Sequence, residues 1–148
     1  MIQDFVKAWN ANQDNLKEYF QTHEMADYRE YKDLVKLLFE LVINPYLKMN
    51  GKKVYNLEHI HEIDDSDCQG TLLYAIPLDT YQPTEWDYVF THQDYGSCPG
   101  CDILEKIQTY DHHQFPNKEQ LFGHMTLCMH LLQKCIIPFS FGNQNQDG

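Results

Sequence analysis

The apolar positions near the N-terminus follow helical spacing in two segments. Residues 2–21 carry apolar side chains three and four positions apart, as in an amphipathic helix. Residues 27–43 show a stronger stripe of the same period, and Asn44-Pro45 follows it directly. Because the residue before a proline disfavours the helical conformation, we expect the second helix to end there.

The middle of the chain changes to patterns that are typical of β-strands. Residues 54–63 alternate between two sets of side chains, residues 71–78 form a short apolar run, and residues 86–94 are rich in strand-forming residues. The links between them are polar and contain Gly or Pro. Three successive segments of this kind predict an antiparallel three-stranded sheet within about residues 54–94.

Helical patterns return after the third predicted strand. One helix is expected to start just after Pro99 and to run to about Thr109. Another is expected to begin at Asn117, where Gln120 completes a capping-box pattern, and to end before Pro138.

The order of elements predicts an α+β fold. We expect one domain over residues 1–141, in which two N-terminal and two C-terminal helices flank the small sheet in sequence and pack on one of its faces. The length of 148 residues and the apolar fraction of 43% suit a single packed core. The polar residues 142–148 are predicted to be a disordered tail.

The sequence gives no sign of a membrane segment or a leader. It contains no apolar run long enough to cross a bilayer, and the first residues lack the basic start and apolar stretch of a signal peptide. We therefore expect a soluble protein in the cytoplasm. Five cysteines, an odd number, favour free thiols, a metal site or a redox pair over a framework of disulfides.

The net charge of −11 is concentrated in one part of the chain. Eleven acidic residues and no Lys or Arg lie between Lys53 and Lys106, whereas the rest of the chain has eleven basic and eleven acidic residues. Such a surface repels nucleic acid and anionic membranes and suits a protein partner with a basic surface. The acidic residues that we predict to bind the partner are Glu58, Glu62, Asp64, Asp65, Asp67, Glu85 and Asp87.

The sharpest local motif is a Cys-x-x-Cys, formed by Cys98 and Cys101, between a predicted strand and a predicted helix. A helix N-terminus favours the thiolate, so the pair could take part in thiol–disulfide exchange or bind a metal. A zinc site would need two more ligands, and His124 and Cys128, one turn apart on the last helix, could supply them. The simpler alternative is that these residues are ordinary turn and core residues.

Other candidates for chemistry are fewer. His59 and His61, with Glu62, form a second possible metal site that lacks defined further ligands. The chain contains no nucleophile elbow, P-loop or dinucleotide fingerprint, so an enzyme is the less favoured class.

Four segments resemble a known group of sequences. They are Gly70-Thr71-Leu72-Leu73, Asp79-Thr80-Tyr81-Gln82-Pro83, Tyr95–Asp102 and Met125-Thr126-Leu127-Cys128. Together they are similar to a family of small tailed-phage and prophage proteins, over roughly residues 62–130. The resemblance implies a phage accessory protein that works inside a bacterial host, and it carries no activity or functional residue with it.

These observations lead to two expectations from different classes. The first is a phage-derived acidic protein without enzymatic activity that binds a host protein, such as one that normally binds nucleic acid, and so inhibits or modulates it. The second is a zinc-binding or thiol-redox protein that uses Cys98 and Cys101.

Overall fold

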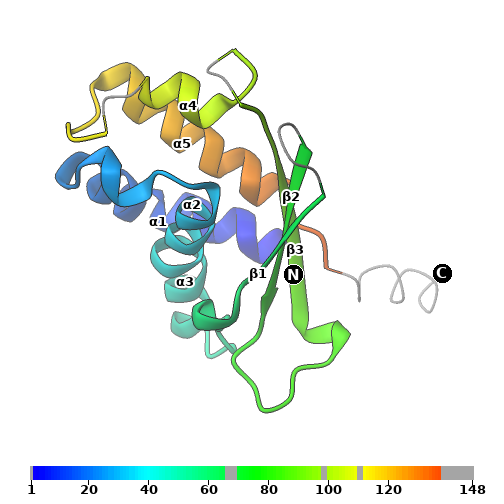
Figure 1. Ribbon diagram of the computed structural model, residues 1–148. Helices are drawn as coiled ribbons and strands as arrows, with labels where there is room; N and C mark the ends of the chain where they lie inside the picture. The colour runs from blue at the N-terminus through cyan, green and yellow to red at the C-terminus, as the bar shows by residue number, and fades with distance from the viewer. Residues whose placement is uncertain (1, 66–69, 98–99, 110–111, 138–148) are drawn as a thin grey trace.

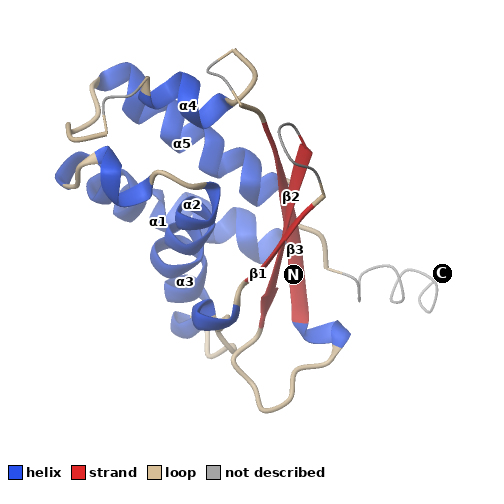
Figure 2. Cartoon of the chain, viewed as in Figure 1, coloured by secondary structure: helices blue, strands red, loops and turns tan. Residues whose placement is uncertain are grey.

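The computed structural model describes residues 2–65, 70–97, 100–109 and 112–137. Helices lie on one side of a three-stranded antiparallel sheet, and the other face of the sheet carries no helix of the described residues (Figures 1 and 2). This is the α+β arrangement that the order of elements predicts. The helices are α1 (Ile2–Thr22), α2 (Tyr31–Leu38), α3 (Asn44–Met49), α4 (Ile103–Gln108) and α5 (Lys118–Gln133).

The second N-terminal helix does not end at Asn44-Pro45, so that prediction is wrong. A π-helical turn over Phe39–Ile43 joins α2 to α3, and Pro45 lies in the first turn of α3. Proline has no N–H to donate to the carbonyl of Leu41, four residues earlier. The side-chain amide of Asn15 in α1 donates to that carbonyl instead, at 3.1 Å. The neighbouring helix thus replaces the hydrogen bond that proline removes.

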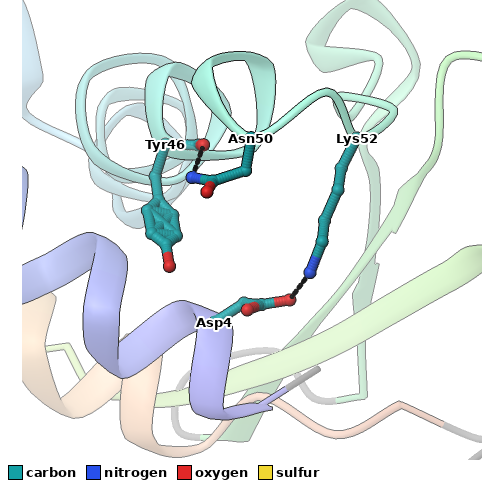
Figure 3. A network of polar contacts seen from close by, with 4 residues as sticks. All are labelled: Asp4, Tyr46, Asn50 and Lys52. Carbon is teal, nitrogen blue, oxygen red and sulfur yellow. Dashed lines mark hydrogen bonds and ion pairs between the residues drawn. The ribbon is translucent and has the colours of Figure 1, made fainter.

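A surface ion pair fixes the start of α1 against the turn after α3. Lys52 Nζ lies 2.6 Å from Asp4 Oδ2, and Asn50 donates to the carbonyl of Tyr46 at 2.8 Å (Figure 3). The hydrogen bond from Lys52 favours the charged carboxylate and lowers the pKa of Asp4 below its usual value.

The sheet is the meander that the sequence predicts. Its strands are β1 (His61–Asp64), β2 (Gly70–Pro77) and β3 (Tyr88–Tyr95), paired in the order β1-β2-β3. The first strand is shorter than predicted. Asn56 accepts a hydrogen bond from the N–H of Glu58 and so starts a 3₁₀ turn over Leu57–His59, which delays the extended chain until His61.

The two faces of the sheet have different surroundings. Tyr74 and Ile76 of β2 and Val89 and Thr91 of β3 are buried against the helices. The Thr91 hydroxyl donates to the carbonyl of Leu131 in α5 at 2.7 Å, which ties the sheet to the last helix. Side chains alternate along a strand, so the residues between them lie on the outer face.

The C-terminal helices begin at capped positions. Asn117 and Gln120 form the predicted capping box at the start of α5. The shorter α4 begins after Asp102, whose side chain accepts from two backbone N–H groups of its first turn. The predicted tail, residues 142–148, lies outside the described residues.

Candidate functional site

An acidic cavity lies between the start of α2, the inner side of β1 and α4. Its volume is about 400 Å³. Leu72, Tyr95, Gln108 and His112 contribute to its walls. The charged residues that line it are five acids and one base: Glu30, Glu62, Asp64, Asp102, Glu105 and Arg29. Two of the acids that the sequence predicts for partner binding, Glu62 and Asp64, therefore lie in one cavity.

Asp102 is the centre of the hydrogen bonds at the base of this cavity. Its carboxylate accepts from the hydroxyl of Tyr31 at 2.6 Å and from the N–H of Gly96 at 3.0 Å. It also accepts from the N–H groups of Leu104 and Glu105, at 3.1 and 3.2 Å. Burial raises the pKa of Tyr31, and the hydrogen bond to Asp102 raises it further. The hydroxyl therefore stays protonated and remains a donor.

Gly96 allows the chain to close this turn. A Cβ atom at this position would lie 2.5 Å from the backbone oxygen of Cys101, which is closer than real Cβ contacts. The glycine lets the end of β3 approach the residue before Asp102. The end of β3, Cys101 and α4 are thereby held at one corner of the cavity.

Two further tyrosines hold the carboxylates of β1. The hydroxyl of Tyr74 donates to Glu62 at 2.8 Å, and that of Tyr95 donates to Asp64. These donors are neutral, so they orient the carboxylates without cancelling their charge. The cavity therefore keeps a negative field and offers oriented acceptors to a cationic group.

The other acids of the predicted partner-binding set are dispersed. Glu58 is exposed on the 3₁₀ turn before β1. Asp65 accepts from the N–H of Thr71, and Asp87 accepts from that of Thr84, so both carboxylates have a backbone partner close by in the chain. Asp67 lies outside the described residues. The structure thus brings together only part of this set.

Glu85 lies on the outer side of the sheet, beside a second hollow. This hollow has a volume of about 530 Å³. It is lined mostly by the side chains of β1 and the outer face of the sheet: His61, Glu62, Ile63, Ala75, Glu85, Tyr88 and Phe90. Its floor is largely apolar, in contrast to the acidic cavity on the inner side.

The structure places part of the predicted zinc site. Cys101 is disulfide-bonded, and Cys98 lies outside the described residues. A sulfur in a disulfide is not a thiolate ligand. Among the described residues, no group of three or more His, Cys, Asp or Glu is arranged to hold a metal ion. His59, His61 and Glu62 are therefore not arranged as a metal site. With Cys98 undescribed, the four-ligand site stays a prediction.

The other two predicted zinc ligands are buried in the helical layer. The ring of His124 packs against Phe20 and Tyr28, with ring centroids 5.3 and 5.0 Å apart. Burial lowers the pKa of His124 to about 4, although the nearby carbonyl of Gln120 partly offsets the shift. Burial likewise raises the pKa of Cys128, which is a free thiol. Both residues behave as core side chains.

His124 also connects the core to the acidic cavity. Its Nε2 atom lies 3.3 Å from the amide nitrogen of Gln108, which lines the cavity and donates to the carbonyl of Tyr28 at 3.1 Å. Nδ1 has no hydrogen-bond partner of good geometry within the described part of the chain.

A groove between α1 and α5 was not predicted from the sequence. Its volume is about 660 Å³, and Phe122 at its edge is 74% exposed. The apolar residues that line it are Trp9, Leu121, Phe122, Met125 and Met129, with Lys17 and Lys118 beside them. The only sequence signal was the apolar character of α5 on more than one side, which is a weak indicator.

Comparison with known protein families, curated proteins and solved structures gave no match. The similarity to phage and prophage proteins therefore stays a prediction. Within the described residues, none of the helices has the length and apolar character needed to cross a membrane.

Proposed function

We propose that this chain is a phage-derived binding protein that uses the acidic cavity beside β1 to hold a basic surface of a host protein. The observation that supports the proposal most directly is the cavity itself, whose lining includes five carboxylates and one guanidinium. These carboxylates come from three separate parts of the chain, which the fold brings to one cavity.

The local chemistry favours a cationic ligand. Tyr31, Tyr74 and Tyr95 donate hydrogen bonds to three of the carboxylates and fix their positions. A Lys or Arg side chain that enters the cavity would meet acceptors that are already oriented. Because these carboxylates need not be ordered on binding, less of the binding free energy is lost as entropy. Long-range attraction by the acidic segment would also speed association with a basic partner.

The binding test uses a labelled peptide rich in Lys and Arg, with fluorescence anisotropy as the measurement. We expect binding to weaken about tenfold or more when NaCl is raised from about 50 mM to about 500 mM, because the Debye length shortens. Duplex DNA should not bind. Binding of the peptide that does not change with salt, or a complex with DNA alone, would contradict the proposal.

A matched pair of variants locates the site. Glu62→Gln with Glu105→Gln removes two charges from the cavity, and Asp14→Asn with Glu119→Gln removes two exposed charges from the helical layer. The first pair should weaken peptide binding several-fold more than the second. Equal losses would show that net charge, and not the cavity, determines binding.

A second candidate is thiol–disulfide exchange. It is supported by the disulfide at Cys101, which lies in the segment between β3 and α4. In this function a reducing thiol would first open the disulfide at Cys101 to two thiols. The thiolate of Cys101 would then attack a substrate disulfide, and the second protein thiol would resolve the mixed disulfide, which re-forms the protein disulfide and releases the substrate as two thiols. Mass mapping of the disulfide, followed by an insulin-reduction assay with and without Cys101→Ser, tests it. Exchange activity that does not depend on Cys101 would exclude it.

A further inference from the structure

The two edges of the sheet are in different states. At the β3 edge, Phe90 and Ile136 exchange backbone hydrogen bonds of 2.9 and 2.7 Å, so a segment of the chain already covers that edge. At the other edge, β1 pairs with β2, and no strand of the described residues lies on its far side. All four residues of β1 are exposed.

The register shows which backbone groups of β1 point outward. Asp65 N–H donates to the carbonyl of Thr71, which makes these two residues a hydrogen-bonded pair. Hydrogen-bonded pairs alternate along an antiparallel ladder, so Ile63 and His61 also direct their backbone groups toward β2. The N–H and C=O of Glu62 therefore point away from the sheet. The hydrogen bond from the N–H of Leu78 to the carbonyl of Asp87 agrees with this assignment. It implies that every second residue of β2 directs its backbone groups toward β3, and that the residues between them direct theirs toward β1.

The residues of β1 line two different hollows, and Glu62 borders both. Glu62, opposite Tyr74, points to the inner side and lines the acidic cavity. His61 and Ile63 point to the outer side and line the hollow above Ala75 and Phe90. A strand laid along β1 would direct successive side chains to these two sides in turn.

We infer that β1 accepts an added antiparallel strand from a partner segment in which basic residues alternate with apolar ones. This inference rests on the proposed function and names the way the partner binds. The basic side chains would enter the acidic cavity on the side of Glu62, and the apolar ones would cover Ile63 and Phe90. Backbone hydrogen bonds to Glu62 would supply affinity, and the two hollows would supply selectivity.

The same charges disfavour a second copy of this chain as the added strand. Pairing of two β1 strands would bring the acidic side chains of one copy, Glu62 and Asp64, to the acidic cavity of the other. Like charges that face each other across paired strands are destabilising. The edge therefore selects for a basic segment and against self-association through β1.

The test compares labelled octapeptides by fluorescence anisotropy in about 50 mM NaCl. One alternates Lys and Val, and its control has the same composition with the four Lys residues before the four Val residues. We expect the alternating peptide to bind about tenfold more tightly, since only it can direct all Lys residues to one side. Equal, salt-sensitive binding of both would overturn strand addition and leave the proposed function standing. Binding of neither would overturn both.

Methylation of the peptide backbone tests the hydrogen bonds directly. In an antiparallel added strand, the residue opposite Glu62 directs its N–H toward β1, and its side chain shares the face of Glu62. That residue is a Lys of the alternating peptide. N-methylation of the Lys residues should abolish binding, and N-methylation of the Val residues should retain it. Any other pattern would overturn the inference.

A matched pair of protein variants tests the outer side. Ile63→Ser removes an isoleucine that is 53% exposed on β1, and Ile103→Ser removes one that is 42% exposed on α4. The first should weaken the alternating peptide about fivefold, and the second should leave binding unchanged. Thermal unfolding of each variant shows that the fold is retained. Equal effects on binding would argue against contact along β1.

Discussion

The acidic cavity beside β1, of about 400 Å³, and the larger groove between α1 and α5, of about 660 Å³, are formed by different interactions. In the cavity, Asp102 and Tyr31 form a buried network in which each polar atom has a partner. In the groove, aromatic and methionine side chains such as the exposed Phe122 lie beside Lys17 and Lys118. The cavity has fixed geometry and a strong field, whereas the groove offers apolar area with little direction.

Because the polar groups of the cavity depend on one another, we expect their substitution to lower the free energy of unfolding strongly. Asp102→Ala removes the cap of α4 and leaves the hydroxyl of Tyr31 and the N–H of Gly96 without their acceptor. We expect a loss of about 3 kcal/mol in the free energy of unfolding, measured with urea. Asp102→Asn should cost less, because its oxygen can still accept from Tyr31.

The control for Asp102 is an exposed carboxylate on β3. Asp94 accepts a hydrogen bond from the hydroxyl of Thr71 at 2.9 Å, in contact with solvent. Asp94→Ala should cost about 0.5 kcal/mol, since water replaces the lost partner. Similar costs at the two positions would mean that the buried network contributes little to stability.

The sequence predicts the parts of this comparison that depend on neighbouring residues. The meander, the capping box of Asn117 and the acidic segment are all encoded over short distances, and the structure contains the first two as predicted. The bond between Tyr31 and Asp102 joins residues 71 positions apart. No local pattern signals such a pair, because each residue is also common at an exposed position.

The features that the sequence did not predict correctly also depend on contacts between distant residues. Pro45 is a strong local signal for the end of a helix, but Asn15 of another helix offsets the lost hydrogen bond. The groove between α1 and α5 also depends on how two distant helices pack. Local propensity predicts secondary structure poorly where a tertiary contact of similar free energy opposes it.

The free energy of unfolding should depend on pH through His124, which is buried in the core between the two hollows. The pKa of this ring is lowered to about 4 in the folded chain by burial, against an ordinary value of 6.5. The unfolded chain therefore binds more protons below pH 6.5, so this contribution to stability is complete above that pH and decreases as pH falls toward 4. We expect a loss of about 2 kcal/mol between pH 7 and pH 5.

Two variants test whether His124 or another histidine causes the pH dependence of unfolding. His124→Gln should remove most of the pH dependence of unfolding between pH 7 and pH 5, and His113→Gln, at a side chain that is 91% exposed, should retain it. Unfolding in urea at the two pH values is the measurement. An unchanged slope in His124→Gln would show that another group titrates in this range.

A carboxylate in the helical layer should matter less than Asp102. Asp4 pairs with Lys52, which is 51% exposed, so solvent screens the interaction. Lys52→Met should cost about 0.5 kcal/mol at pH 7. Because the pKa of Asp4 is lowered in the fold, this contribution is present above the ordinary pKa and is lost as pH falls through the lowered one. A cost that does not decrease as pH falls would indicate lost packing by the Lys52 side chain.

The smallest effect is expected at the groove. Phe122 is 74% exposed, so Phe122→Ala removes little buried area and should change the free energy of unfolding by less than about 0.5 kcal/mol. Phe20, fully buried in the adjacent α1, supplies the contrast, because Phe20→Ala leaves a cavity and should cost about 3 to 5 kcal/mol. Urea unfolding of both variants measures the difference. A large cost at Phe122 would show that the groove is held together by its own apolar contacts, and the contrast with the polar network of the acidic cavity would then fail.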